Sequence, residues 1–200
     1  MVVQTEKRYC TPEEYLQLEA TAEFKSEYRD GEIVPMTGGT TNHNEIAGNF
    51  YARFKLTLGR PNYRVYMGDV RLWISQYRLY TYPDVMVISG EPAYEGSGTT
   101  TVTNPVLVVE VLSNSTKNYD RGDKFQYYRS IPSLREYITI DQYKCYIEQF
   151  AKNSENKWVL TEYTTADEVM TLSASEFQIQ LSELYQGVNF EMKGDSTVDS

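Results

Sequence analysis

Residues 105–112 read Pro-Val-Leu-Val-Val-Glu-Val-Leu, an apolar run interrupted by a single acid. A short run of this kind is typical of a strand that is buried on both faces of a sheet. Strand alternation puts Glu110 on the face of Val106 and Val108. The opposite face carries Leu107, Val109 and Val111. An ionised carboxylate there is costly unless a cation or hydrogen-bond donors compensate for it. Either Glu110 ligates a metal ion, or it lies at a strand end and reaches solvent or an arginine.

A second acid opens the preceding apolar run, residues 84–88. Asp84 follows Pro83, which cannot donate a hydrogen bond to a sheet ladder and therefore marks the beginning of a strand. Two acids on neighbouring strands can converge on one divalent ion, with their nearest oxygens about 4–6 Å apart and with carbonyls and waters as further ligands. Alone, Asp84 would be expected to cap a turn. Together with Glu110 it favours the metal site.

The remaining sequence predicts one mixed α/β domain over residues 1–200, with a disordered tail from about residue 190. Helices are predicted from Thr11-Pro12 onward and over residues 42–58, 120–129 and 181–185. Asn42 and Glu45 resemble the capping box of the second helix. Strands are predicted on both sides of the Asp30-Gly31 turn and over residues 63–74, 84–88, 105–112, 136–140, 144–150 and 157–163. Residues 90–103 are predicted to form a loop.

The composition restricts which metal ions and which charged partners the protein can bind. The chain carries 19 Lys and Arg against 28 Asp and Glu, a formal net charge of −9. This balance argues against a general electrostatic grip on nucleic acid, although a local basic groove is compatible with it. His43 is the single histidine and there are two cysteines, so zinc sites built on several imidazoles or four thiolates are excluded. Oxygen ligands favour magnesium, manganese or calcium.

The cellular location is predicted from the membrane, secretory and disulfide signals that the sequence lacks. No apolar stretch approaches the roughly 20 residues of a membrane helix. The first residues, MVVQTEKRYC, lack the apolar core of a secretory signal. Cys10 and Cys145 match no disulfide framework. We therefore expect a cytoplasmic protein without a membrane partner.

Several stretches taken together resemble a known family. They are, in order, EYLQLEATAEFKSEYRDGEIVPMTG, then His43, YTYPDVMVISG, NPVLVVEVLSNST, YDRGDKFQYYRSIPSLREYITID and Trp158. With Pro83-Asp84 and Glu110, they resemble the PD-(D/E)xK nuclease superfamily and, within it, the Uma-type family, a bacterial domain family of unknown function grouped with restriction endonucleases. The resemblance extends from about residue 9 to residue 185. It implies a restriction-endonuclease-like core with flanking helices and extra C-terminal strands.

One position departs from the superfamily pattern. A lysine is expected two residues after the strand glutamate, where this chain has Leu112. The resemblance implies a migrated lysine, with Lys124 the first candidate and Lys117 the reserve. A lysine side chain spans roughly 6 Å, enough to cross from a packed helix to a strand end. We therefore predict that the Lys124 ammonium lies within direct or one-water reach of the Glu110 carboxylate. Without the resemblance, Lys124 would be assigned to a solvated helix face.

Three further residues are candidates for the site. Glu27 matches the N-terminal glutamate of the family, which the resemblance implies supplements the metal site; a turn or surface carboxylate is the alternative. His43 matches a family position, but its phase in the second helix also fits a core or capping histidine. Asp69 is a supporting candidate whose default role is a salt bridge with Arg71 or another base.

The resemblance implies a magnesium-dependent phosphodiesterase, with manganese as an alternative ion, that cleaves nucleic acid and most simply DNA. Asp84 and Glu110 would hold the ion with the carbonyl of Val111. Lys124 would orient or deprotonate the attacking water or stabilise the charge on the phosphate, and Glu27 would hold a second ion or an outer-shell water. Because nucleases of this fold often dimerise, the expected assembly is a homodimer.

Two other functions stay open. A non-catalytic relative would use the same fold for binding or regulation, with Leu112 marking a lost active site and the net charge of −9 in its favour. An interaction domain would use its 18 tyrosines as a homodimer face. Ser113 lacks a G-x-S-x-G context, and neither a phosphate loop nor a dinucleotide fingerprint is present.

Overall fold

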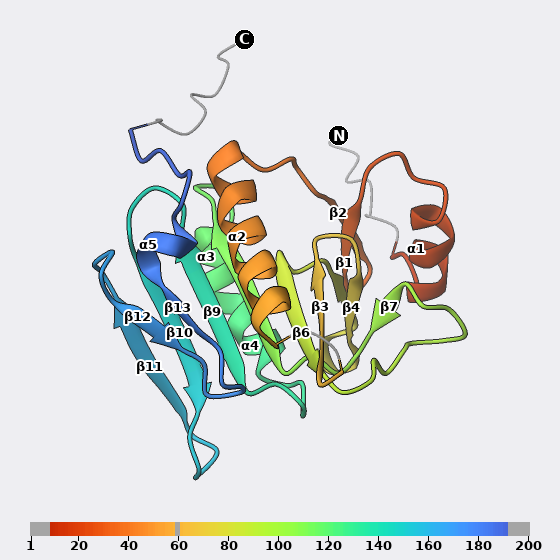
Figure 1. Ribbon diagram of the computed structural model, residues 1–200. Helices are drawn as coiled ribbons and strands as arrows, with labels where there is room; N and C mark the ends of the chain where they lie inside the picture. Colours follow the sequence, from red (N-terminus) through yellow and green to blue (C-terminus); the bar gives the residue numbers. More distant parts are fainter. Residues whose placement is uncertain (1–8, 59–60, 192–200) are drawn as a thin grey trace.

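A six-stranded sheet forms the centre of the molecule in the computed structural model, which describes residues 9–58 and 61–191 (Figure 1). Its strand order is β11-β10-β9-β8-β6-β3. β8 and β9 are parallel, and the other neighbours are antiparallel. The bounds are β3 Tyr63–Met67, β6 Val85–Ser89, β8 Leu107–Leu112, β9 Glu136–Asp141, β10 Ile147–Lys152 and β11 Trp158–Tyr163. Beyond residue 191, the predicted disordered tail lies outside the described residues.

Two smaller sheets complete the strands. The five-stranded sheet has the order β2-β1-β5-β4-β7, with β4 and β7 parallel. Its bounds are β1 Ser26–Arg29, β2 Glu32–Pro35, β4 Arg71–Ile74, β5 Leu79–Thr81 and β7 Thr101–Val102. A two-stranded sheet pairs β12 Val169–Thr171 with β13 Gln178–Gln180. The hairpin predicted at Asp30-Gly31 is confirmed: both residues have positive φ, 38° and 101°, which suits the short connection between β1 and β2.

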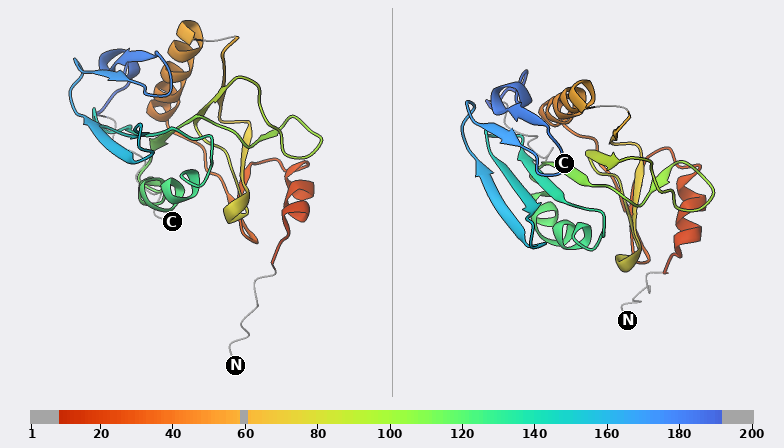
Figure 2. Two further views of the ribbon diagram at one scale, coloured as in Figure 1. Left: turned by 90° about the horizontal axis from the view of Figure 1, so that it is seen from below. Right: turned by 60° about the horizontal axis from the view of Figure 1, so that its bottom comes forward.

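Helices cover both faces of the six-stranded sheet. The helices of the described chain are α1 Pro12–Glu19, α2 Thr41–Leu58, η1 Ser75–Tyr77 (a 3₁₀ turn), α3 Lys117–Tyr119, η2 Asp120–Lys124 (a π-helical turn), α4 Phe125–Tyr128 and α5 Leu181–Leu184. Of these, α2 lies on one face of the six-stranded sheet and α3, η2 and α4 lie on the other (Figures 1 and 2). The segments α3, η2 and α4 follow one another directly. They include the helix predicted over residues 120–129, which begins three residues earlier than expected.

The alternation predicted for β8 is confirmed by its packing. Leu107, Val109 and Val111 belong to the core beneath α2, whereas Val108 belongs to the core shared with Tyr128 of α4 and with the five-stranded sheet. All six β8 residues are buried, as expected for a strand covered on both faces. Figure 2 shows α1 on the outer side of the five-stranded sheet, away from the six-stranded sheet. Glu110 therefore points into the layer between the two larger sheets.

The single strand predicted over residues 63–74 is wrong. The chain turns at Gly68, which has φ of 64°, and the Asp69 N–H donates to the Met67 carbonyl at 2.7 Å. As a result β3 joins the six-stranded sheet and β4 the five-stranded one. The predicted loop over residues 90–103 also contains the short strand β7. Among the described residues, no helix combines the length and the apolar character needed to cross a bilayer.

Candidate active site

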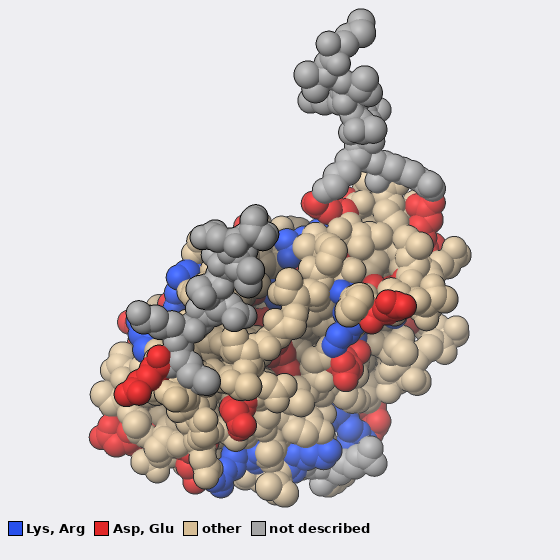
Figure 3. Space-filling model, turned by 90° about the horizontal axis from the view of Figure 1, so that it is seen from above, with Lys and Arg blue, Asp and Glu red and all other residues tan. Residues whose placement is uncertain are grey.

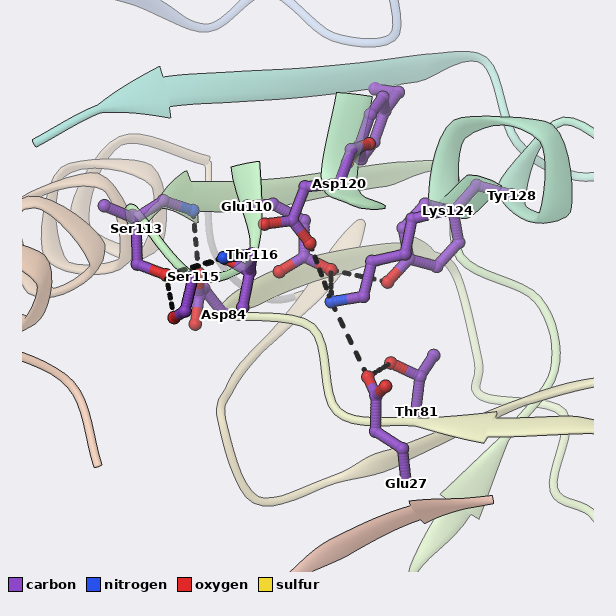
Figure 4. Close-up of polar contacts among 12 residues, drawn as sticks. Glu27, Thr81, Asp84, Glu110, Ser113, Ser115, Thr116, Asp120, Lys124 and Tyr128 are labelled. Atoms are coloured by element: carbon purple, nitrogen blue, oxygen red, sulfur yellow. Dashed lines mark hydrogen bonds and ion pairs between the residues drawn. The ribbon is translucent and has the colours of Figure 1, made fainter. Parts of the chain in front are cut away.

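The Lys124 ammonium lies at the centre of a buried acidic cluster (Figure 4). Its Nζ is 3.0 Å from Glu110 Oε1, 3.2 Å from Asp120 Oδ1 and 3.6 Å from Glu27 Oε1. The side chain is only 9 % exposed. These contacts join β8 of the six-stranded sheet, β1 of the five-stranded sheet and the η2 turn between α3 and α4. The prediction that the Lys124 ammonium lies within direct reach of the Glu110 carboxylate is confirmed.

The helix presents its polar residues at a spacing of four. Asp120, Lys124 and Tyr128 would drift around an α-helix, because each step of four exceeds one turn of about 3.6 residues. The π turn over Asp120–Lys124 adds a residue to one turn and offsets this drift. The buried Tyr137 hydroxyl donates to the Asp120 carbonyl at 2.8 Å. Lys124 and Tyr128 therefore both face Glu110.

Glu110 accepts two contacts on one oxygen. The Tyr128 hydroxyl donates to Oε1 at 2.5 Å, and Lys124 lies against the same atom. Burial raises the pKa of Glu110 to about 8; Lys124 opposes this shift, and the nearby charges of Asp84 and Asp120 add to it. Burial also works against the Lys124 ammonium, but the charges of Glu110 and of its other neighbours hold the pKa of Lys124 well above its usual value.

Glu27 lies inside the cluster, although a turn or surface position was the alternative. Its Oε1 accepts from the Thr81 hydroxyl at 2.5 Å, and its Oε2 accepts from Arg29 Nη2 at 2.5 Å and Nε at 3.1 Å. Burial disfavours its charge, but Lys124, Thr81 and Arg29 together hold the pKa of Glu27 below its usual value. The five-stranded sheet thus supplies an ionised acid to the end of the central sheet.

Asp84 lies one residue before β6, at the outer end of the cluster. Since Val85 pairs with Val109 in the antiparallel ladder, Asp84 and Glu110 occupy the next opposed positions. Opposed residues of such a ladder project to the same side. Asp84 Oδ2 accepts from the Val111 N–H at 2.7 Å, and Oδ1 lies 2.8 Å from His43 Nε2. The register supports the predicted convergence of the two acids, and the separation of about 4–6 Å stays a prediction.

His43 contacts Asp84 from the first turn of α2 and is neither a core residue nor a cap. Burial lowers its pKa, but the hydrogen bond and charge of Asp84 raise the pKa of His43 above its usual value overall. The Thr40 hydroxyl accepts from the His43 N–H at 3.2 Å, so Thr40 caps the helix in place of the predicted Asn42. Gly39 passes so close that a Cβ there would lie 3.2 Å from the His43 ring.

The structure does not bring the other candidates into the cluster. Asp69 lies in the turn before β4 with its side chain 87 % exposed. Its salt bridge with another base is confirmed, because it pairs with Lys25 at 2.7 Å. Lys117 is exposed and its Nζ lies 3.4 Å from Asn114 Oδ1. Leu112 is buried, and its carbonyl accepts from the Gln142 side chain at 2.8 Å.

The residues present fit a hard divalent cation better than a zinc ion. Within residues 9–58 and 61–191, no three His, Cys, Asp or Glu side chains are grouped so as to hold a metal by themselves. Magnesium commonly uses one or two carboxylates and completes its shell with water and substrate phosphate. The Lys124 ammonium is shared among three of the carboxylates, whereas Asp84 lies beside His43 and accepts from the Val111 N–H. A divalent ion at Asp84 and Glu110 would add positive charge to this acidic cluster.

The surface above this end of the molecule is not broadly basic. Figure 3 views the molecule from the end at which α2 begins, with basic side chains (blue) scattered among acidic ones (red) and neutral residues over most of the area. The Asp84 and His43 side chains are each 21 % exposed, whereas those of Glu27, Glu110 and Lys124 are below 10 %. Solvent therefore reaches the cluster at its Asp84 and His43 end.

Sequence reasoning missed the polar partners of the cluster: Arg29, Thr81, Asp120 and Tyr128. A signal for two of them is present, because Asp120 and Tyr128 flank Lys124 at a spacing of four and so share its helix face. Arg29 contacts Glu27 from two residues further along β1, where strand alternation places both side chains on one face, so a local signal for it is also present. Thr81 reaches Glu27 across the pairing of β1 with β5, which no local pattern indicates.

Comparison with known proteins agrees with this architecture. The Uma2 family, described as "Putative restriction endonuclease", matches residues 12–183, and the chain belongs to it. Two proteins of Synechocystis sp. (strain ATCC 27184 / PCC 6803 / Kazusa) are similar along most of their length. "Uncharacterized protein sll1609" is 44 % identical over 162 residues, covering 81 % of this chain and 91 % of that protein. "Uncharacterized protein slr1290" is 34 % identical over 180 residues, covering 90 % and 93 %.

A solved structure shares the fold. It is described as a putative nuclease belonging to DUF820 from Anabaena variabilis ATCC 29413, and it superposes with a TM-score of 0.72 over 88 % of this chain and 97 % of that one. The sequence identity is 17 %, so the likeness concerns the fold. The predicted mixed α/β, restriction-endonuclease-like fold is confirmed.

Proposed function

We propose that this protein is a divalent-metal-dependent phosphodiesterase that hydrolyses nucleic acid, with DNA as the expected substrate and Mg²⁺, or Mn²⁺ in its place, as the cofactor. The observation that carries the proposal is the buried lysine at the centre of acids from both sheets. The family description, "Putative restriction endonuclease", supports the substrate class. Cytoplasmic location and a homodimer stay predictions.

Asp84 and Glu110 are the residues that would hold the ion, with the Val111 carbonyl as the predicted third ligand. A bound divalent ion stabilises negative charge on the phosphate and makes a water molecule easier to deprotonate. The Val111 N–H and His43 fix the Asp84 carboxylate in place. Glu27 would bind a second ion or an outer-shell water, because its carboxylate stays ionised beside Lys124.

Lys124 would orient the attacking water and stabilise the charge that develops on the phosphate oxygens. Because neighbouring carboxylates hold the pKa of Lys124 well above its usual value, the ammonium keeps its protons near neutral pH. A permanently charged ammonium is suited to electrostatic stabilisation, not to proton abstraction. Of the three roles predicted for this lysine, its charge supports orienting the water and stabilising the phosphate, and not deprotonating the water.

Cleavage of supercoiled plasmid and of labelled single-stranded and double-stranded oligonucleotides tests the proposal. We expect phosphodiester cleavage that requires Mg²⁺ or Mn²⁺, stops with EDTA and is absent from Glu110→Gln purified in parallel. Equal cleavage by both proteins would assign the activity to a contaminant and contradict the proposal.

The affinity for Mg²⁺ should rise with pH until about pH 8. Since burial raises the pKa of Glu110 to about 8, a proton competes with the metal below that value and the ligand is ionised above it. The apparent Kd should therefore fall about tenfold per pH unit between pH 6 and 8 and then level off. Calorimetric titrations at pH 6, 7, 8 and 9 measure it; a flat profile would show that Glu110 is not the titrating ligand.

A binding or regulatory module is the second candidate function. The net charge of −9 and the closed salt bridges of Lys124 favour it. Such a module would bind nucleic acid or a protein without cleaving it. Nucleic-acid binding that is unaffected by EDTA and by Glu110→Gln, without cleavage of any substrate above, would support this alternative.

A further inference from the structure

The two oxygens of Glu110 have different surroundings. Tyr128 and Lys124 both approach Oε1, at 2.5 Å and 3.0 Å. Over the described ranges 9–58 and 61–191, no hydrogen bond ends on Oε2. A carboxylate oxygen offers two lone-pair sites, so Oε1 is fully used and Oε2 is left for another ligand.

Tyr128 fixes this arrangement more firmly than Lys124 does. Its side chain is fully buried, and its ring packs against Tyr137 with centroids 5.2 Å apart. A tyrosine has a rigid ring, and its hydroxyl is directed at one partner. Lys124 has a flexible stem and divides its ammonium among three carboxylates. Without the tyrosine hydroxyl, the Glu110 carboxylate would be free to rotate about its last torsion angle.

We propose that Tyr128 is a positioning residue of the metal site: its hydroxyl holds Glu110 Oε1 so that Oε2 alone is presented to a divalent ion. The inference rests on the proposed function, because it needs Glu110 to be a metal ligand. Partners that orient a ligating carboxylate typically contribute 10–100-fold to metal affinity or activity.

Magnesium titration calorimetry on Tyr128→Phe tests the proposal. The phenylalanine keeps the ring packing and removes the hydroxyl, and we expect the affinity for Mg²⁺ to fall at least about tenfold. The matched control is Tyr15→Phe. Tyr15 is also fully buried and donates a single hydrogen bond, to the Ser26 carbonyl at 2.6 Å, but it lies in the separate core beneath α1. Both variants lose a buried hydrogen bond, and only Tyr128→Phe should lose metal affinity.

The outcomes separate this inference from the proposed function. If Mg²⁺ binds wild-type protein, Glu110→Gln abolishes binding and Tyr128→Phe binds normally, the positioning role is wrong and the metal site stands. If Glu110→Gln binds Mg²⁺ like wild type, the proposed function itself fails.

Infrared difference spectra of wild-type protein, with and without Mg²⁺, provide a measurement that does not depend on the folding of Tyr128→Phe. We expect the Glu110 bands, assigned by their loss in Glu110→Gln, to show the splitting of a carboxylate bound through one oxygen. The splitting of a bidentate carboxylate would overturn the proposal.

Discussion

Lys124→Met should reduce phosphodiester cleavage by at least about 100-fold while leaving Mg²⁺ bound at least as tightly as in wild type. The methionine keeps most of the buried stem but removes the charge that stabilises the phosphate. Because that charge also repels a metal ion held by Glu110, its loss should not weaken metal binding. Cleavage rates and calorimetry on the same preparation measure both effects.

The same substitution should lower the free energy of unfolding by about 3–5 kcal/mol, because breaking a buried ion pair leaves its partners uncompensated. Glu27, Glu110 and Asp120 surround Lys124 with almost no access to solvent. Because Lys124 lowers the pKa values of Glu27 and Glu110, its loss raises both folded-state values, so the stability deficit of the variant is smallest at low pH and grows as pH increases. Urea unfolding should therefore show a larger deficit at pH 8 than at pH 5.

Lys117→Met is the matched control. Lys117 lies on the same helix but is exposed and touches only Asn114 among the contacts of its ammonium in the described chain. We expect wild-type cleavage and stability from this variant. Full cleavage by a folded Lys124→Met protein would contradict the role given to Lys124, and loss of cleavage in Lys117→Met would transfer that role to the reserve lysine.

Glu110→Gln and Glu136→Gln should have opposite effects. Both glutamates are buried in neighbouring strands of the same sheet. Glu110→Gln should abolish Mg²⁺ binding and cleavage but unfold at a urea concentration close to that of wild type, because it removes one of several clustered negative charges. Calorimetry and urea unfolding of both variants test the pair.

Glu136→Gln should keep metal binding and lose about 1–3 kcal/mol of stability. Its carboxylate accepts the Ser173 and Ala174 N–H groups at 2.8 Å each and the Gln149 amide at 2.7 Å, and so ties the segment after β12 to β9. A neutral amide is a weaker acceptor and brings an N–H₂ group against these donors. Loss of Mg²⁺ binding in both variants would mean that binding reports general damage to the fold.

Much of the central sheet could be predicted because its signals are local. The apolar run around Glu110 and the proline before Asp84 identify two buried strands. These two strands, β6 and β8, are close in the sequence and pair with each other in the sheet. The strand predicted over residues 63–74 is wrong because alternation continues across Gly68. The chain instead turns at Gly68, which has positive φ, and the two halves join different sheets.

The candidate site could be predicted where its residues lie close together along the chain. Glu110 lies on β8 and Lys124 lies on the helical segment that follows it, so the packing of that one segment on the strand brings the two residues together. Asp69 was misplaced because its position follows from the turn at Gly68, which the alternation conceals. The contact of Glu27 with the cluster depends on how the two sheets pack, and the residue pattern alone left its surface alternative open.

The most direct test of the account is anomalous scattering from crystals grown with saturating MnCl₂. We expect one manganese peak coordinated by Asp84 and by Glu110 Oε2, with Tyr128 and Lys124 still bound to Oε1. A cluster without a manganese peak, in crystals that bind the ion elsewhere, would contradict the assignment of Asp84 and Glu110 as the metal ligands.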